Sequence, residues 1–235
     1  MEMSKREEPE ASFPLRVIGA LEVASVTLSV LITVWAIIPL QLNHPGLVAL
    51  PGLFALILMI HSHRVRRETL HDLGFTMRYF GRAILLLALP MIIGGAVLIA
   101  VGSLHGSLQV KPRFWASLAL LPLWGLIQQY ILQGFIYRRL RFVLAYENAS
   151  AAKQVKRTQL AILLTAILFA LVHAPNLPLM ALAFLGGLVW SWVYERAPNL
   201  FALGLSHALM STIVMLSLPA HSMRIGYEYF IYRGF

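Results

Sequence analysis

The chain has 235 residues, of which 59% are hydrophobic and only 12% are charged, and its formal net charge is +9. A soluble domain carries about 25% charged residues, so this composition excludes an ordinary water-soluble protein and predicts an all-α, polytopic membrane protein. The absence of cysteine excludes disulfides, thiolate metal sites and cysteine nucleophiles. Because the basic residues cluster beside apolar segments, we assign the positive charge to membrane topology and anionic lipid, and we expect no nucleic-acid partner.

Seven apolar segments follow one another along the chain. A helix needs about 20 residues to cross the hydrocarbon core, and we place the spans at residues 15–40, 46–60, 79–101, 114–136, 158–172, 177–194 and 200–218. Between the second and third spans, basic, acidic and apolar positions alternate, and residues 70–75 are expected to form an amphipathic interfacial segment.

The spans divide the chain into four predicted parts. Residues 1–14 are expected to be a flexible cytoplasmic leader, residues 15–113 hold three N-terminal helices, residues 114–218 hold a four-helix core, and residues 219–235 form an aromatic tail suited to the membrane interface. With a cytoplasmic N-terminus, the inner segments contain all the basic residues except Lys111, Arg113, Arg224 and Arg233. This asymmetry follows the positive-inside rule and predicts an integral membrane protein with its N-terminus in the cytoplasm.

Polar side chains occur at three places inside these spans. Gln128, Gln129 and Gln133 lie in the fourth span, His173 ends the fifth, and His207 lies within the seventh, one helical turn before Ser211. Polar groups are costly in lipid, so intramembrane histidines and amides are candidates for function. The alternatives are amides that only hold helices together, a helix-end histidine at the interface, and a core histidine satisfied by a serine.

The sixth span carries a row of small residues. Ala183, Gly187 and Ser191 recur at a spacing of four, which allows a neighbouring helix to approach closely. We expect the fifth to seventh spans to pack tightly enough to bring the two histidines near each other. The span limits oppose this, because they place His173 about 10 Å further across the membrane than Gln128 and His207 at 1.5 Å per residue.

The order of these motifs resembles the CPBP family, the CAAX proteases and bacteriocin-processing proteins also called Abi. The resemblance covers residues 118–216 and rests on the amide pair, on Phe169-xxx-His173, on a Gly-rich span ending in Tyr194-x-Arg196, and on His207-xxx-Ser211. It implies a metal-independent intramembrane glutamic protease without a cofactor, in a bacterial inner (plasma) membrane, acting on a membrane-associated peptide or a membrane-anchored protein.

The resemblance also implies roles for individual residues. Gln128 and Gln129 occupy the two positions of a catalytic Glu-Glu pair, and Gln133 occupies the position of an arginine. His173 corresponds to the water-activating histidine, and His207 with Ser211 to the pair that stabilises the oxyanion. Every charged group of the first motif is therefore an amide in this chain.

The amides change the expected chemistry. A glutamine side chain cannot accept a proton, and the loss of a general base typically costs about 10²–10⁴ in rate. His173 remains as a base near neutral pH. Glu22, in the first span, is the carboxylate that could replace the missing pair, unless it makes only a buried hydrogen bond or lies at the interface. Glu195 is expected to form a surface pair with Arg196.

Two functions from different classes follow. The chain is either a CAAX-protease-like peptidase that activates water, or a catalytically inactive relative that serves as a membrane binding or scaffold protein, such as an immunity or maturation partner. The chain has no HExxH motif and no phosphate-binding loop, and we expect neither a metal nor a cofactor. A transporter is a weaker alternative, because paired halves with broken helices and buried charge pairs are not evident.

Overall fold

The computed structural model describes residues 13–38, 45–110, 114–145, 150–219 and 223–231. Within these residues the fold is all-helical and contains seven helices that are long and apolar enough to span a membrane, which confirms the predicted fold class. Most of the predicted leader, residues 1–12, and two parts of the predicted tail, residues 220–222 and 232–235, lie outside the described residues.

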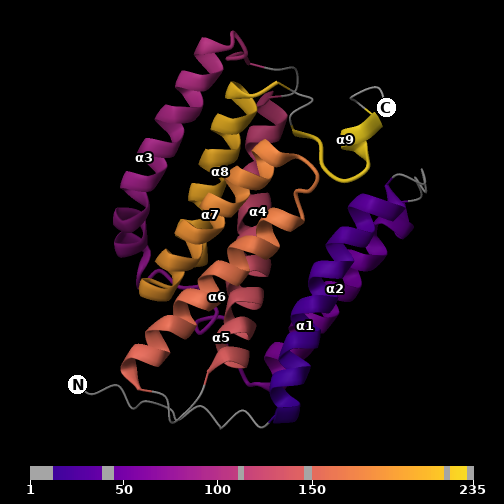
Figure 1. The fold of residues 1–235 in the computed structure, drawn as a ribbon, viewed down its shortest axis with the longest axis vertical. Helices are drawn as coiled ribbons and strands as arrows, with labels where there is room; N and C mark the ends of the chain where they lie inside the picture. The colour runs from indigo at the N-terminus through magenta and orange to yellow at the C-terminus, as the bar shows by residue number, and fades with distance from the viewer. Residues whose placement is uncertain (1–12, 39–44, 111–113, 146–149, 220–222, 232–235) are drawn as a thin grey trace.

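Figure 1 shows the helices of the described residues. Their bounds are α1 Phe13–Ile32, continued by the π-helical turn η1 Thr33–Ile37, α2 Pro45–Val65, α3 Phe80–Leu104, α4 Phe114–Gln129, the π-helix η2 Tyr130–Tyr137, α5 Arg138–Leu144, α6 Ala151–Leu171, α7 Leu177–Arg196, α8 Leu200–Ser217 and the short α9 Glu228–Ile231.

Several helices extend beyond the predicted spans into polar sequence. α2 continues past residue 60 to Val65, and α6 begins seven residues before the predicted start at residue 158. Hydropathy locates only the apolar part of a helix, whereas backbone hydrogen bonding continues into the interface. The fourth span likewise continues helically beyond residue 136 to Leu144.

The segment between α2 and α3, predicted to be amphipathic and interfacial, has an exposed part and a part that is buried against protein. Residues 70–74 form successive turns, in which residues 70–72 are exposed while Leu73 and Gly74 are buried against protein. Leu73 is buried, and its carbonyl accepts a hydrogen bond from the hydroxyl of Tyr194 at 2.8 Å. The next carbonyl, of Gly74, accepts from the backbone N–H of Leu200 at 2.9 Å. The segment is therefore anchored to the connection between α7 and α8.

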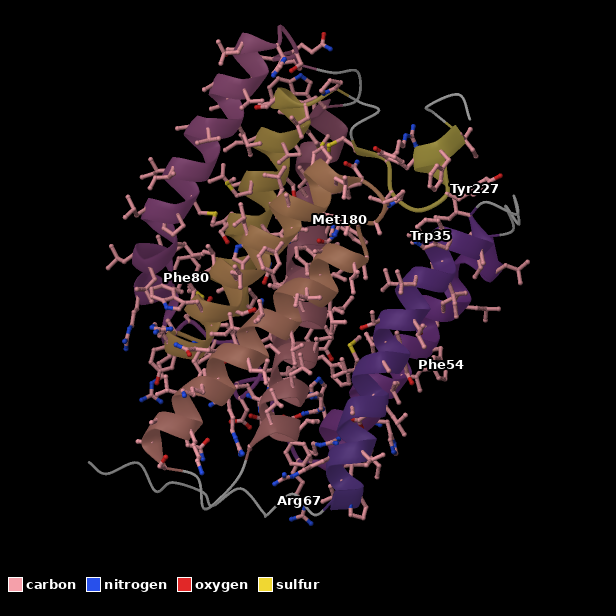
Figure 2. All side chains as sticks on the ribbon, in the orientation of Figure 1. Trp35, Phe54, Arg67, Phe80, Met180 and Tyr227 are labelled. Carbon is pink, nitrogen blue, oxygen red and sulfur yellow. The ribbon has the colours of Figure 1, made fainter. Side chains whose placement is uncertain are left out.

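The bundle is built around α8, which packs against both α3 and α4, while α6 packs against α7. α1 and α2 form a pair beside this bundle, and α1 contacts it through α5 (Figure 1). Figure 2 shows Arg67 at one end of the pair formed by α1 and α2, and Trp35 and Tyr227 toward the other end of that pair. We call these the basic end and the aromatic end.

The small-residue row predicted on the sixth span is confirmed as a helix contact. Ala183, Gly187 and Ser191 of α7 are buried. A Cβ at Gly187 would lie 2.8 Å from the Cα of Ala166 on α6, so only glycine allows the two backbones to approach this closely. The contact fixes α6, and with it the chain leading to His173, against α7.

The described part of the tail covers the α6–α7 turn at the aromatic end. The side-chain amide of Asn176 donates to the carbonyl of Arg224 at 2.9 Å, and the N–H of Gly226 donates to the carbonyl of Ala174 at 2.7 Å. Phe230 then packs on Trp35, with ring centroids 6.2 Å apart. The tail therefore links the end of α1 to the turn that carries His173.

Candidate functional site

The amide motif lies where the fourth span changes from α-helix to π-helix. α4 ends at Gln129, and η2 runs from Tyr130 to Tyr137. Gln129 and Gln133 are fully buried, and Gln128 is half-buried. A π-helical turn adds a residue and re-aims the side chains around it, and such turns are frequent at functional sites. Hydropathy and spacing gave no indication of this change.

Gln129 and His207 are in direct contact. The amide nitrogen Nε2 of Gln129 lies 3.0 Å from Nδ1 of His207, although the two residues are 78 positions apart. The imidazole stacks on Trp190, with centroids 4.5 Å apart and an interplanar angle of 2°. The indole N–H of Trp190 donates to Ser206 Oγ at 3.0 Å. His207 is therefore held on one face by an aromatic ring and at Nδ1 by an amide.

His173 joins this cluster through Phe169. Nδ1 of His173 lies 2.7 Å from the carbonyl oxygen of Phe169, and the two rings meet edge to face at 4.8 Å. The ring of Phe169 also meets His207 at 6.0 Å. Both histidines therefore contact the same ring, although the predicted span limits place His173 about 10 Å further across the membrane than His207. His173 lies beyond the end of α6 and turns back onto its last turn.

A carbonyl oxygen can only accept a hydrogen bond, so His173 donates from Nδ1–H. In the neutral imidazole this leaves Nε2 as the basic nitrogen. Burial lowers the pKa of His173 below its ordinary value, and the hydrogen bond to the carbonyl of Phe169 opposes that shift only in part. His173 is thus neutral at physiological pH and retains one acceptor nitrogen.

The remaining predicted residues have separate contacts. Gln133 donates from Nε2 to Ser191 Oγ on α7 at 3.1 Å. The side-chain oxygens of Gln128, Gln129 and Gln133 are buried without a hydrogen-bond partner among the described residues. Ser211 is half-buried, and it makes none of the described hydrogen bonds of His207. The cluster therefore brings together Gln129, His173 and His207, with Phe169 and Trp190 between them.

The described carboxylates are all engaged away from this cluster. Glu22 pairs with Arg66 at 3.0 Å and with Arg139 at 3.4 Å, so in this structure it does not replace the missing acid. Glu195 pairs with Arg141 at 3.0 Å. The expected pair of Glu195 with Arg196 is wrong. The guanidinium of Arg196 lies over the ring of Trp192, 4.2 Å from its centroid.

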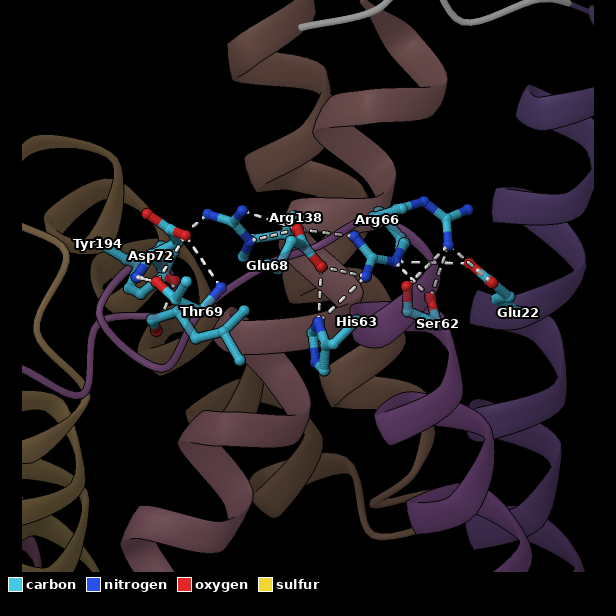
Figure 3. A network of polar contacts seen from close by, with 11 residues as sticks. Glu22, Ser62, His63, Arg66, Glu68, Thr69, Asp72, Arg138 and Tyr194 are labelled. Atoms are coloured by element: carbon cyan, nitrogen blue, oxygen red, sulfur yellow. Dashed lines mark hydrogen bonds and ion pairs between the residues drawn. The ribbon is translucent and has the colours of Figure 1, made fainter. Parts of the chain in front are cut away.

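A second polar cluster, which sequence analysis did not predict, lies at the basic end (Figure 3). The carboxylate of Glu68 accepts from Arg138 at 2.7 Å, from Arg139 at 2.5 Å and from His63 Nδ1 at 2.6 Å. Arg139, only 1% exposed, also donates to Ser62 Oγ at 3.0 Å. We call Glu22, Ser62, His63, Arg66, Glu68, Arg138 and Arg139 the ion network; it joins α1, α2, the following loop and α5.

The ion network is expected to make the free energy of unfolding depend on pH through Glu68. Burial alone would raise the pKa of Glu68, but hydrogen bonds from His63 and Arg139 and the charges of Arg138 and Arg139 lower it well below its usual range. A carboxylate whose folded pKa is depressed contributes stability above its unfolded pKa, about 4.3, and loses it as the pH falls further.

We therefore expect the difference in unfolding free energy between wild type and Glu68→Gln to be constant from about pH 8 to about pH 5 and to shrink below about pH 4. Denaturant unfolding in detergent micelles, followed by circular dichroism at several pH values, measures this difference. A difference that already shrinks between pH 7 and pH 5 would contradict the assignment.

An apolar groove of about 250 Å³ is lined by side chains of α4 and α8. These side chains belong to Pro122, Leu123, Leu126, Phe201 and Leu205, and neither histidine contributes to the groove. The histidines thus meet in a buried cluster, not in this groove. Within the described residues, no three His, Asp or Glu side chains gather in a way that could hold a metal ion.

Comparison with known proteins identifies the segment that carries the site. Residues 110–213 match the family model of the Rce1-like type II CAAX prenyl endopeptidases. Separate comparisons with curated proteins and with solved structures found no match. The matched segment includes the amide motif, both histidines and Ser211. The resemblance predicted from the motifs is therefore confirmed: over residues 110–213 this integral membrane protein is similar to the Rce1-like type II CAAX prenyl endopeptidases.

Proposed function

We propose that this membrane protein binds a membrane-associated peptide or a membrane-anchored protein at its histidine cluster without hydrolysing it efficiently. The similarity over residues 110–213 supports a CAAX-protease-like function. The observation that carries the proposal is the contact of Gln129 Nε2 with His207 Nδ1 at 3.0 Å, at a position where the resemblance predicts a glutamate. An amide there orients the histidine but cannot take a proton from water.

One observation favours slow hydrolysis as a second candidate. The bond from His173 Nδ1 to the carbonyl of Phe169 leaves His173 Nε2 free to act as a base. A neutral histidine can activate water near neutral pH. Without a carboxylate beside it, such a base is expected to work about 10²–10⁴ more slowly than the complete site.

The placement of the protein is part of the proposal. We infer a bacterial inner membrane with the basic end in the cytoplasm, which gives a cytoplasmic N-terminus. The cluster of Arg66, Arg67, Arg138, Arg139 and Arg141 near that end supports this orientation under the positive-inside rule. In this proposal residues 1–14 lie in the cytoplasm and residues 219–235 lie at the opposite membrane interface. Residues 15–113 precede the core of residues 114–218.

The test uses the full chain in proteoliposomes and a farnesylated fluorogenic peptide that ends in Cys-aliphatic-aliphatic-X. Wild type is expected to bind this peptide with no measurable turnover. Restoring the acids with Gln128→Glu and Gln129→Glu, together with Gln133→Arg, should raise turnover by at least about 100-fold, because a general base is regained. In that background His173→Ala should abolish turnover.

Gln109→Glu provides the matched control, because Gln109 is exposed in the loop after α3 and the same chemical change there should leave turnover unchanged. Multiple turnovers by wild type that are lost in His173→Ala would establish the second candidate in place of the first. The absence of both binding and turnover in every variant would contradict both.

A further inference from the structure

The two histidines of the cluster present opposite hydrogen-bonding groups. We propose that Gln129 is a positioning residue that holds His207 in the tautomer protonated at Nε2, so that the pair offers one acceptor, His173 Nε2, and one donor, His207 Nε2–H. This combination is complementary to an uncharged peptide group. The identity of the ligand rests on the proposed binding function. The tautomer of His207 and the role of Gln129 are tested without any ligand.

The tautomer of His207 follows from the identity of its partner atom. The atom within 3.0 Å of His207 Nδ1 is the amide nitrogen of Gln129. A side-chain amide nitrogen only donates hydrogen bonds, so Nδ1 must be the acceptor. A neutral imidazole that accepts at Nδ1 carries its proton on Nε2. A carboxylate at position 129 would impose the reverse, because it only accepts.

The residues around His207 hold its imidazole in the orientation in which Nδ1 faces Gln129. Gln129 is fully buried and His207 is 6% exposed, so water does not compete for Nδ1. Trp190 stacks on the imidazole, and its own N–H is tied to Ser206 Oγ, which in turn donates to the carbonyl of Leu203 at 2.8 Å. An imidazole fixed on its face and at one nitrogen has its other nitrogen aimed in a single direction.

His173 has the opposite constraint. Its Nδ1 donates to a backbone carbonyl, which leaves a lone pair on Nε2. Both rings contact Phe169, so the donor and the acceptor belong to one cluster. A peptide group has one N–H donor and one C=O acceptor, whereas a carboxylate has acceptors only. The pair therefore favours an internal peptide bond over a free C-terminal carboxylate.

The tautomers can be measured directly. Protein labelled with ¹⁵N-histidine, in proteoliposomes at about pH 8, is studied by solid-state NMR, where protonated and unprotonated ring nitrogens resonate far apart. His207→Ala and His173→Ala assign the two sets of signals by their loss. We expect a proton on Nε2 of His207 and on Nδ1 of His173. A proton on Nδ1 of His207 in wild type would overturn the inference.

Variants separate positioning from simple packing. Gln129→Glu should move the proton of His207 to Nδ1 or add one there, while His173 stays unchanged. Gln133→Glu is the matched control, because Gln133 is equally buried but bonds Ser191, and it should leave His207 protonated at Nε2. If Gln129→Glu does not fold, Gln129→Leu removes the donor without adding charge and should give a mixture of tautomers. An unchanged Nε2–H signal in Gln129→Leu would overturn the role of Gln129.

Ligand recognition is tested with two small molecules that differ in one group, an apolar N-alkyl amide and the carboxylate of the same chain length. The amide is expected to bind wild type at least about tenfold more tightly, because the carboxylate faces an acceptor that it cannot satisfy. Gln129→Leu should lose most of this preference. Equal binding of both molecules to wild type would overturn the proposed preference for a peptide group over a carboxylate. Rapid hydrolysis by wild type would instead contradict the proposed function and leave the measured tautomers standing.

Discussion

Arg139→Met is expected to lower the free energy of unfolding by about 3 kcal/mol, the lower end of the range for breaking a buried ion pair. The loss stays at this lower end because Glu68 keeps Arg138 and His63 as partners and Glu22 keeps Arg66. Arg139 is 1% exposed. Its guanidinium lies 2.5 Å from the Glu68 carboxylate and 3.4 Å from that of Glu22, and it also contacts Ser62 and His63. The change thus affects the junction of α1, α2 and α5 at once. Unfolding of the purified protein in mixed micelles of increasing SDS fraction measures the loss.

Arg141→Met is the matched control on the same helix. Arg141 pairs with Glu195 at 3.0 Å, but its side chain is 34% exposed, and a pair in that setting contributes about 0–1 kcal/mol. The double variant Arg139→Met with Glu68→Gln should lose less than the sum of the two single losses, because the charge left behind is also removed. Equal losses in Arg139→Met and Arg141→Met would show that the ion network does not stabilise the fold.

The second large effect is expected where α4 crosses α8. A Cβ at Gly125 would lie 2.5 Å from the carbonyl oxygen of Gly204 and 3.1 Å from the backbone nitrogen of Ala208. Backbone atoms cannot rotate away, so Gly125→Ala must push the helices apart, at a cost of about 1–3 kcal/mol, and Gly125→Val should cost more. The displacement lies one helical turn from the contact between Gln129 and His207.

Gly52→Ala in α2 is the control, because no atom lies within 4 Å of the added Cβ. It should be neutral or slightly stabilising, since alanine is the better helix former by about 0.5–1 kcal/mol. The same SDS titration compares the two variants. If Gly125→Ala is as well tolerated as Gly52→Ala, the backbones of α4 and α8 do not approach each other closely at Gly125.

Local features of the molecule could be predicted from the sequence, whereas contacts between distant residues could not. The number of spans and the close packing at Gly187 followed from local patterns, because helix length and residue size are properties of single segments. The meeting of His173 and His207 could not be obtained from span limits. It depends on His173 turning back onto Phe169 beyond the end of its helix. The expected partner of Glu195 was wrong because sequence adjacency placed it beside Arg196, whereas α5 brings Arg141 to it.

By itself, the amino-acid sequence determined an all-α membrane protein and the run of amides Gln128, Gln129 and Gln133, at positions where the family resemblance predicts two carboxylates and an arginine. These are matters of composition and order, which need no contacts. Only the tertiary structure decided that Gln129 bonds His207, that Trp190 stacks on it, and that Glu22 belongs to the ion network at the basic end. Such pairings join residues about 17 to 117 positions apart, and they depend on helix rotation, including that of the π-helix η2, to which hydrophobic periodicity is insensitive.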